Sequence, residues 1–142
     1  MAMKSITAAE LSSHASAGDL WVAVHGLVWD VTEFLADHPG GPEVVEAVAG
    51  KDCTSDFEDA LHSAAARTET RMRLVGVLEG SETQVESWRA KGWTQDQGIP
   101  DVDKLHRAGG GTASGGQWFL TVGAAAATAI CAAALMLLKA RK

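Results

Sequence analysis

The feature that most constrains the fold is an uncharged stretch near the carboxyl end, "WFLTVGAAAATAICAAALMLL", residues 118–138. Its 21 residues would form a helix about 32 Å long, close to the roughly 30 Å hydrocarbon core of a bilayer. Trp118 and Phe119 suit one membrane interface, and the basic tail "KARK", residues 139–142, suits the other. A buried core helix is the alternative, because the stretch contains eight alanines and is only moderately apolar. The rest of the chain is too small to bury such a helix, so we expect a transmembrane anchor.

The residues before the anchor are expected to form two parts, a globular part at residues 1–80 and a linker at residues 81–117. "GGGTASGG" within the linker has the composition of a flexible tether, and Gly98 and Pro100 interrupt any long helix before it. "SETQVESW" and "DVDKLHRA" each suit a short helix. The globular part carries 13 acidic and 5 basic side chains, a charge that repels the phosphates of nucleic acid and suits a basic protein surface.

The globular part is expected to be α+β, with short elements. Thr7 and Glu10 form a capping-box pattern before a helix at "AAELSSHA", and "LWVAVHGLVWDV" predicts two strands that turn at His25-Gly26. A closing strand is expected at "LVGVL", and helices are expected at "TEFLAD", "PEVVEAVA", "TSDFEDAL" and "SAAARTETRMR". Pro42 suits the first position of the second of these helices, and Gly50 suits its end. A core this small would gain from the apolar volume of a cofactor.

Two histidines are candidates for holding that cofactor. His38 lies in the rigid bend "HPGG", and His62 lies in "DALHSAAAR"; each follows one helix and precedes another. The residues around them are apolar, namely Phe34, Leu35, Val44, Val45, Val48, Phe57 and Leu61. Two imidazoles that face each other across an apolar slot fit the two axial positions of a haem iron.

Simpler interpretations of the same residues remain open at this point. A His-Pro pair is common in turns, and a histidine at a helix end can interact with the helix dipole. Zinc is disfavoured because no third or fourth ligand lies nearby. The two cysteines, Cys53 and Cys131, form no zinc cluster and no C-x-x-C-H motif for covalent haem attachment, and His14, His25 and His106 suit surface or turn positions.

Residues 5–78 resemble cytochrome b5. The stretches "LWVAVHGLVWDVTEFLADHPGG" and "AGKDCTSDFEDALHSAAAR" follow the order of that family, and "HPGG" and the second histidine match its two haem-ligand positions. The resemblance implies a small mixed sheet with short helices, and non-covalent haem b with His38 and His62 as axial ligands. It also places Phe34, Val45 and Phe57 in the lining of the pocket, and Ser63 at a haem propionate.

The sequence departs from the family pattern at a few positions near this pocket. Glu69 and Arg73 stand near positions that relatives fill with bulky apolar residues, and Trp29 replaces a tyrosine. The pair Ala60-Leu61 replaces smaller residues before the second histidine. None of these changes affects the two ligand positions.

The resemblance implies a membrane-anchored carrier of single electrons rather than an enzyme. Its expected donor is a flavin-containing cytochrome b5 reductase or a similar protein, and its expected acceptors are membrane-bound oxygenases or desaturases. The haem domain would face the cytosol, on the endoplasmic reticulum or alternatively on the mitochondrial outer membrane. Two rivals are a haem- or ligand-binding chaperone module and a tail-anchored adaptor whose haem has no redox role.

Overall fold

The computed structural model describes residues 2–108, whose centre is a five-stranded mixed sheet in the order β1-β5-β4-β3-β2. β1 is parallel to β5, and the other neighbours are antiparallel. The strands are β1 (Ser5–Ile6), β2 (Ala15–Ser16), β3 (Asp19–Val24), β4 (Leu27–Asp30) and β5 (Arg73–Leu78). The expected α+β class with a small mixed sheet is therefore confirmed.

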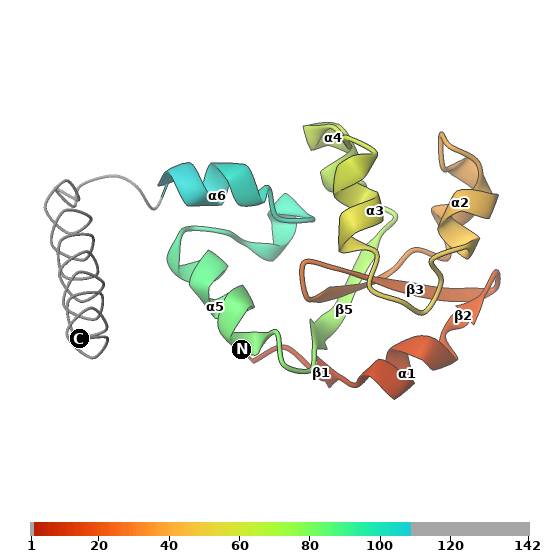
Figure 1. The fold of residues 1–142 in the computed structure, drawn as a ribbon, viewed down its shortest axis with the longest axis horizontal. Helices are drawn as coiled ribbons and strands as arrows, with labels where there is room; N and C mark the ends of the chain where they lie inside the picture. The colour runs from red at the N-terminus through yellow and green to blue at the C-terminus, as the bar shows by residue number, and fades with distance from the viewer. Residues whose placement is uncertain (1, 109–142) are drawn as a thin grey trace, which may run out of the picture. The chain divides into compact units, whose positions relative to one another are not determined.

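Six α-helices and two 3-10 helices accompany this sheet within the described residues. They are α1 (Ala8–Ser13), η1 (Leu35–Asp37), α2 (Pro42–Glu46), α3 (Thr54–Asp59), α4 (Ala64–Arg67), α5 (Glu82–Ala90), η2 (Gln95–Gln97) and α6 (Val102–Ala108). α2 and the α3–α4 pair rise on the same side of the sheet, whereas α1 lies at its other side (Figure 1). None of the helices within residues 2–108 has the length and apolar character needed to cross a membrane.

Several elements that local sequence patterns predicted are present in the structure. The oxygen Oγ1 of Thr7 accepts a hydrogen bond from the backbone N–H of Glu10 at 3.0 Å, and α1 begins at the next residue after Thr7. Strands β3 and β4 pair directly across the turn His25-Gly26, where both residues have positive φ (52° and 72°), the geometry of a primed two-residue hairpin turn. Pro42 begins α2 at a position where its missing N–H costs nothing.

Several helices end earlier than the sequence predicted: α2 ends at Glu46 rather than just before Gly50, α3 ends at Asp59, and two other segments are shortened more strongly. The segment "TEFLAD" forms a turn and the 3-10 helix η1, because the Asp30 carboxylate accepts hydrogen bonds from the backbone N–H and the hydroxyl of Thr32, at 3.1 and 2.6 Å. Pro39 then holds the preceding His38 in an extended conformation, which ends the helical path. In "SAAARTETRMR" only residues 64–67 are helical, and β5 begins at Arg73.

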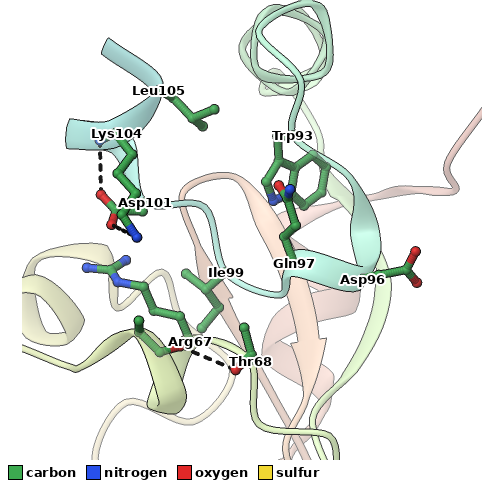
Figure 2. A pocket seen from close by; sticks show the side chains of 10 residues that line it. Arg67, Thr68, Trp93, Asp96, Gln97, Ile99, Asp101, Lys104 and Leu105 are labelled. Atoms are coloured by element: carbon green, nitrogen blue, oxygen red, sulfur yellow. Dashed lines mark hydrogen bonds and ion pairs between the residues drawn. The ribbon is translucent and has the colours of Figure 1, made fainter. Parts of the chain in front are cut away.

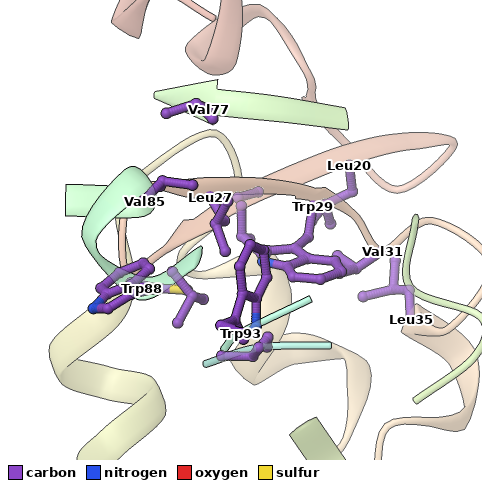
Figure 3. Close-up of a cluster of buried hydrophobic side chains, with 14 of the residues drawn as sticks. Leu20, Leu27, Trp29, Val31, Leu35, Val77, Val85, Trp88 and Trp93 are labelled. Carbon is purple, nitrogen blue, oxygen red and sulfur yellow. The ribbon is translucent and has the colours of Figure 1, made fainter. Parts of the chain in front are cut away.

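The expected linker is the main difference between prediction and structure. Residues 82–108 form α5, η2 and α6 and belong to one compact unit with the preceding domain. Figure 3 shows Val85, Trp88 and Trp93 beside Leu27 and Trp29 of β4, and these residues belong to one buried cluster. Ile99 and Leu105 join the same cluster. The expected boundary at residue 80 is therefore wrong as a limit of the folded part, because apolar side chains beyond it complete the core.

The remaining expected segments lie outside the described residues. These are the end of the linker after residue 108, the anchor 118–138 and the tail 139–142.

Candidate metal centre

His38 is held by the bend that follows η1. Its ring nitrogen Nδ1 lies 3.2 Å from the carbonyl oxygen of Gly41 and also 3.2 Å from the backbone nitrogen of Gly40. A carbonyl oxygen can only accept, so a proton on Nδ1 makes the Gly41 contact a hydrogen bond and leaves Nε2 with a free lone pair, whereas in this tautomer Nδ1 does not accept from the Gly40 N–H. Gly41 has φ of +91°, a conformation that favours glycine, so this bend depends on the second glycine of "HPGG".

His62 is held by the end of α3. Its Nδ1 lies 2.6 Å from the carbonyl oxygen of Phe57, and its ring stacks on the Phe57 ring with centroids 4.1 Å apart and planes 1° apart. Donation to that carbonyl again leaves Nε2 as the free nitrogen. Leu61 precedes it with φ of +53°, a conformation that is uncommon for a residue other than glycine and is often found near functional sites.

The structure brings the two candidate ligands together. The ring centroids of His38 and His62 are 6.3 Å apart, with 51° between the planes. Metal–imidazole bonds of about 2.0–2.1 Å, plus about 1.1 Å from each nitrogen to its ring centroid, separate two imidazoles on opposite sides of one metal by about 6.3 Å. The spacing of the pair therefore fits a single ion between two imidazoles.

The other possible metal ligands do not extend this pair. Within residues 2–108, no group of three or more His, Cys, Asp or Glu side chains is placed to hold a metal ion. Burial raises the pKa of the Cys53 thiol to about 12, so the thiol stays protonated and is a poor ligand. A metal held by these two histidines would take its other ligands from outside this set of side chains, as haem iron does from its porphyrin.

The surroundings of the pair suit a large apolar group. Phe34 meets the His38 ring edge-on at 5.6 Å, and Val45 and Phe57 are partly buried against the core. Val44 and Leu61 are the exposed large apolar side chains of the described part, at 51% and 88%, and both are close in sequence to a candidate ligand. Exposed apolar side chains at these places would be covered by a flat apolar cofactor.

Ser63 follows the second histidine and caps α4. Its Oγ accepts a hydrogen bond from the backbone N–H of Ala66 at 3.3 Å, and the residue is exposed. A hydroxyl that accepts a hydrogen bond still has its own proton to donate. Ser63 could therefore also donate to a carboxylate at the rim of the site, as the resemblance implies.

Two arginines that the sequence analysis did not single out lie over the phenylalanines of the site. The guanidinium carbon of Arg67 is 5.1 Å from the centroid of the Phe57 ring, and that of Arg71 is 5.1 Å from the centroid of the Phe34 ring. Each candidate ligand thus contacts an aromatic ring that also faces a cation. Glu69 pairs with Arg71 at 2.9 Å. These arginines follow His62 closely in the sequence, but only the fold shows which rings they meet.

Arg73 does not serve the aromatic rings in this way. It pairs with Asp30 at 2.8 Å, and its side chain is exposed. Arg73 is therefore held by Asp30 at the end of β4.

Glu58 hydrogen-bonds with Arg67 and His25 and follows Phe57, the residue that stacks on the second histidine. Both carboxylate oxygens of Glu58 accept hydrogen bonds from Arg67, at 2.9 and 2.7 Å, and Oε1 lies 2.7 Å from Nε2 of His25. The Arg67 hydrogen bonds are the main reason that the pKa of Glu58 is lowered to about 2. His25 is thus a turn residue, as predicted, with an additional polar contact; His14 stacks on Trp21, and His106 is exposed.

Comparison with known proteins places this site in a family. Residues 7–79 match the family model described as "Cytochrome b5-like Heme/Steroid binding domain". The chain is 48% identical over 75 residues to an NADH-cytochrome b5 reductase-like protein of Emericella nidulans, a match that covers 53% of this chain and 17% of the relative. It is 44% identical over 84 residues to cytochrome b5 isoform D of Arabidopsis thaliana, covering 59% and 60%.

Further similar proteins include an animal relative and a solved structure. Cytochrome b5 of Drosophila melanogaster is 41% identical over 95 residues, covering 66% of this chain and 71% of the relative. The solved structure of Ectothiorhodospira vacuolata cytochrome b558 is 32% identical, covers 54% of this chain and 99% of that chain, and superposes with a TM-score of 0.48. The chain spans about three fifths of the plant relative and about a sixth of the fungal one.

Proposed function

The chain belongs to the family of cytochrome b5-like haem/steroid-binding domains, and on that premise we propose that it is a haem-binding electron carrier. The pair His38 and His62 supports this most directly, because its 6.3 Å centroid spacing fits two axial ligands of one haem b iron. Phe34, Val45 and Phe57 would line the haem, and Ser63 would donate a hydrogen bond to a propionate. Haem iron supplies one-electron chemistry by alternating between its ferric and ferrous states.

The chain's own residues would restrict that chemistry to electron transfer. The carbonyls of Gly41 and Phe57 orient the two imidazoles through their Nδ1 atoms. Two protein ligands would leave the iron no open position for oxygen or a substrate, which disfavours catalysis at the metal. The exposed apolar rim at Val44 and Leu61 suits a cofactor edge that a partner protein can approach.

The first experiment is an absorption and electron paramagnetic resonance study of the haem-loaded chain. We expect a low-spin, six-coordinate spectrum, and we expect His38→Ala and His62→Ala each to abolish it because each leaves one axial position without its ligand. His14→Ala, which changes a histidine outside the site, serves as the matched control. Parental spectra in both site variants would refute the ligand assignment.

A reductase-coupled assay then separates the carrier from the adaptor whose haem has no redox role. Rapid reduction of the haem by a flavin-containing reductase, followed by reoxidation by an acceptor, is expected of the carrier. The similarity to a fungal NADH-cytochrome b5 reductase-like protein supports a cytochrome b5 reductase as the donor. Membrane-bound oxygenases or desaturases are the proposed acceptors.

Acidic side chains near the site support a basic partner surface. Several exposed carboxylates lie in the two ligand-bearing segments, and we call four of them the acidic rim: Glu43, Glu46, Asp52 and Asp59. Glu58 lies in the same region, but its charge is paired with Arg67. A rim of one sign raises association rates with a partner of the opposite sign.

We also propose that residues 118–138 anchor the domain in a membrane, with residues 139–142 on the far side and the domain in the cytosol. The support is the length and uncharged composition of that stretch. The endoplasmic reticulum is the proposed membrane, with the mitochondrial outer membrane as the alternative. Because residues 82–108 belong to the folded unit, only residues 109–117 are left for the proposed linker, and a flexible glycine-rich chain of that length would reach about 17 Å.

A further inference from the structure

The segment that follows η2 makes reciprocal backbone and side-chain contacts with the end of α4. The backbone N–H of Ile99 donates to the carbonyl oxygen of Arg67 at 2.8 Å, and Nη1 of Arg67 donates to the carbonyl oxygen of Pro100 at 3.1 Å. We call residues 93–105 the clamp segment. It lies outside residues 7–79, the part of the chain that matches the family model.

Gly98 allows this close approach. Its φ is +66°, and a Cβ atom at this position would overlap the carbonyl oxygen of Arg67, so only glycine fits here. Trp93 fixes the segment from the other side, because its Nε1–H donates to the Gly98 carbonyl oxygen at 3.1 Å and its ring is buried in the core. The clamp segment is therefore attached both to the core and to α4.

Arg67 connects the clamp segment to the second candidate ligand. Its guanidinium is held by both oxygens of Glu58 and by the Pro100 carbonyl, and it lies over the face of Phe57. Phe57 in turn stacks on the ring of His62 and accepts its Nδ1 proton at the backbone carbonyl. The clamp segment thus reaches His62 through a continuous series of packed groups.

The same contacts border a cavity of about 500 Å³ between α4 and the clamp segment. Figure 2 shows Arg67 and Thr68 below Ile99. Asp101 and Lys104 lie at the left of this view, and Trp93 and Gln97 lie at the right. Lys104 also lines this cavity, where it pairs with Asp101 and is largely exposed. Within the described residues, Arg67 is the cation that lies over the Phe57 ring. Lys104 provides a natural control for the charge of Arg67.

We propose that the clamp segment holds Arg67 over the Phe57–His62 stack, so that Arg67 is a positioning residue for the second haem ligand. The inference rests on the proposed function, because it takes His62 as an iron ligand. Groups that orient a metal ligand affect metal affinity by about 10- to 100-fold when they are removed. A positive charge near the ligand also disfavours the ferric state, which carries one more positive charge than the ferrous state, and so raises the reduction potential.

The first test compares Gly98→Ala with Gly92→Ala in the full-length, haem-loaded chain. Both glycines have positive φ, but a Cβ on Gly92 would meet nothing within 4 Å. The readout is the rate of haemin transfer to excess apomyoglobin. We expect Gly98→Ala to release haemin at least about tenfold faster than the parent, and Gly92→Ala to stay within about twofold. Equal release rates for the two variants would overturn the proposal.

The second test keeps the glycines and changes the charge, so it does not depend on whether Gly98→Ala folds. Arg67→Met removes the guanidinium, Arg67→Lys restores a cation, and Lys104→Met removes a positive charge elsewhere at the same cavity. We expect a lower reduction potential and faster haemin release in Arg67→Met, a potential that returns toward the parental value in Arg67→Lys, and parental behaviour in Lys104→Met. An unchanged potential in Arg67→Met, or an equal shift in Lys104→Met, would overturn the proposal.

The parent chain distinguishes failure of this inference from failure of the proposed function. A parent without six-coordinate, low-spin haem would refute the ligand assignment and with it the role of Arg67. A parent with that spectrum, together with variants that match it in haemin release and potential, would refute the clamp alone.

Discussion

Replacement of Trp88 by alanine tests whether α5 is part of the folded domain or of a tether. Trp88 is 2% exposed, belongs to the same buried cluster as Leu27 and Trp29, and meets the His25 ring edge-on at 5.8 Å. Removal of a buried tryptophan side chain costs about 3–5 kcal/mol, from lost burial and from the cavity left behind. That is a large part of the roughly 5–15 kcal/mol by which most domains are stable.

The assay is urea unfolding of the haem-loaded full-length chain, followed by far-ultraviolet circular dichroism at a fixed haem concentration. Glu86→Ala is the matched control, because Glu86 lies on the same helix and is exposed. We expect Trp88→Ala to lower the free energy of unfolding by at least about 3 kcal/mol, and Glu86→Ala to change it by less than about 0.5 kcal/mol. The corresponding fall in melting temperature for Trp88→Ala is at least about 10 °C.

A flexible tether predicts the opposite result. If residues after 80 did not pack on the domain, both substitutions would leave the urea midpoint close to that of the parent. Equal midpoints for Trp88→Ala, Glu86→Ala and the parent would therefore refute the assignment of α5 to the core.

Three further predictions concern pH, partners and the membrane. Because the pKa of Glu58 is about 2 in the folded chain against 4.5 for a free glutamate, its pairing stabilises the fold above pH 4.5, and this stabilisation is lost as the pH falls toward 2. Glu58→Gln should therefore be less stable than the parent at pH 5, with a difference in urea midpoint that shrinks by pH 3; a constant difference would contradict the pairing. Association with a basic reductase should slow between 0.1 and 1 M salt, as the Debye length falls from about 10 to about 3 Å, and stopped-flow rates that stay flat would count against steering by the acidic rim. A chain cut before Trp118 should stay soluble, keep its haem and reduce a membrane-bound acceptor more slowly than the full chain at equal bulk concentration, because it is no longer confined to the membrane plane; equal rates would refute the anchor.

Local sequence was sufficient for the features that depend on neighbouring residues. The turn at His25-Gly26, the Thr7 cap and the start of α2 at Pro42 formed as predicted, because each depends on side chains within a few positions of one another. The choice of His38 and His62 as a candidate pair rested on their bends, their apolar surroundings and the resemblance, and their role as iron ligands stays a prediction. The sequence could not give their 6.3 Å spacing, since it results from α2 and α3 rising on one side of the sheet.

Only the tertiary structure decided that the folded part extends beyond residue 80. Within α5 the buried positions are Val85 and Trp88, too few to produce a strong helical pattern, and Gly98 and Pro100 resemble ordinary linker residues. Their roles depend on partners far away in the sequence: Trp88 lies in a core that includes residues of β3, β4 and β5, and Gly98 makes room for the carbonyl of Arg67. A local pattern reports which conformations a segment can adopt, whereas burial and close backbone approach depend on the opposing surface, which exists only once the chain has folded.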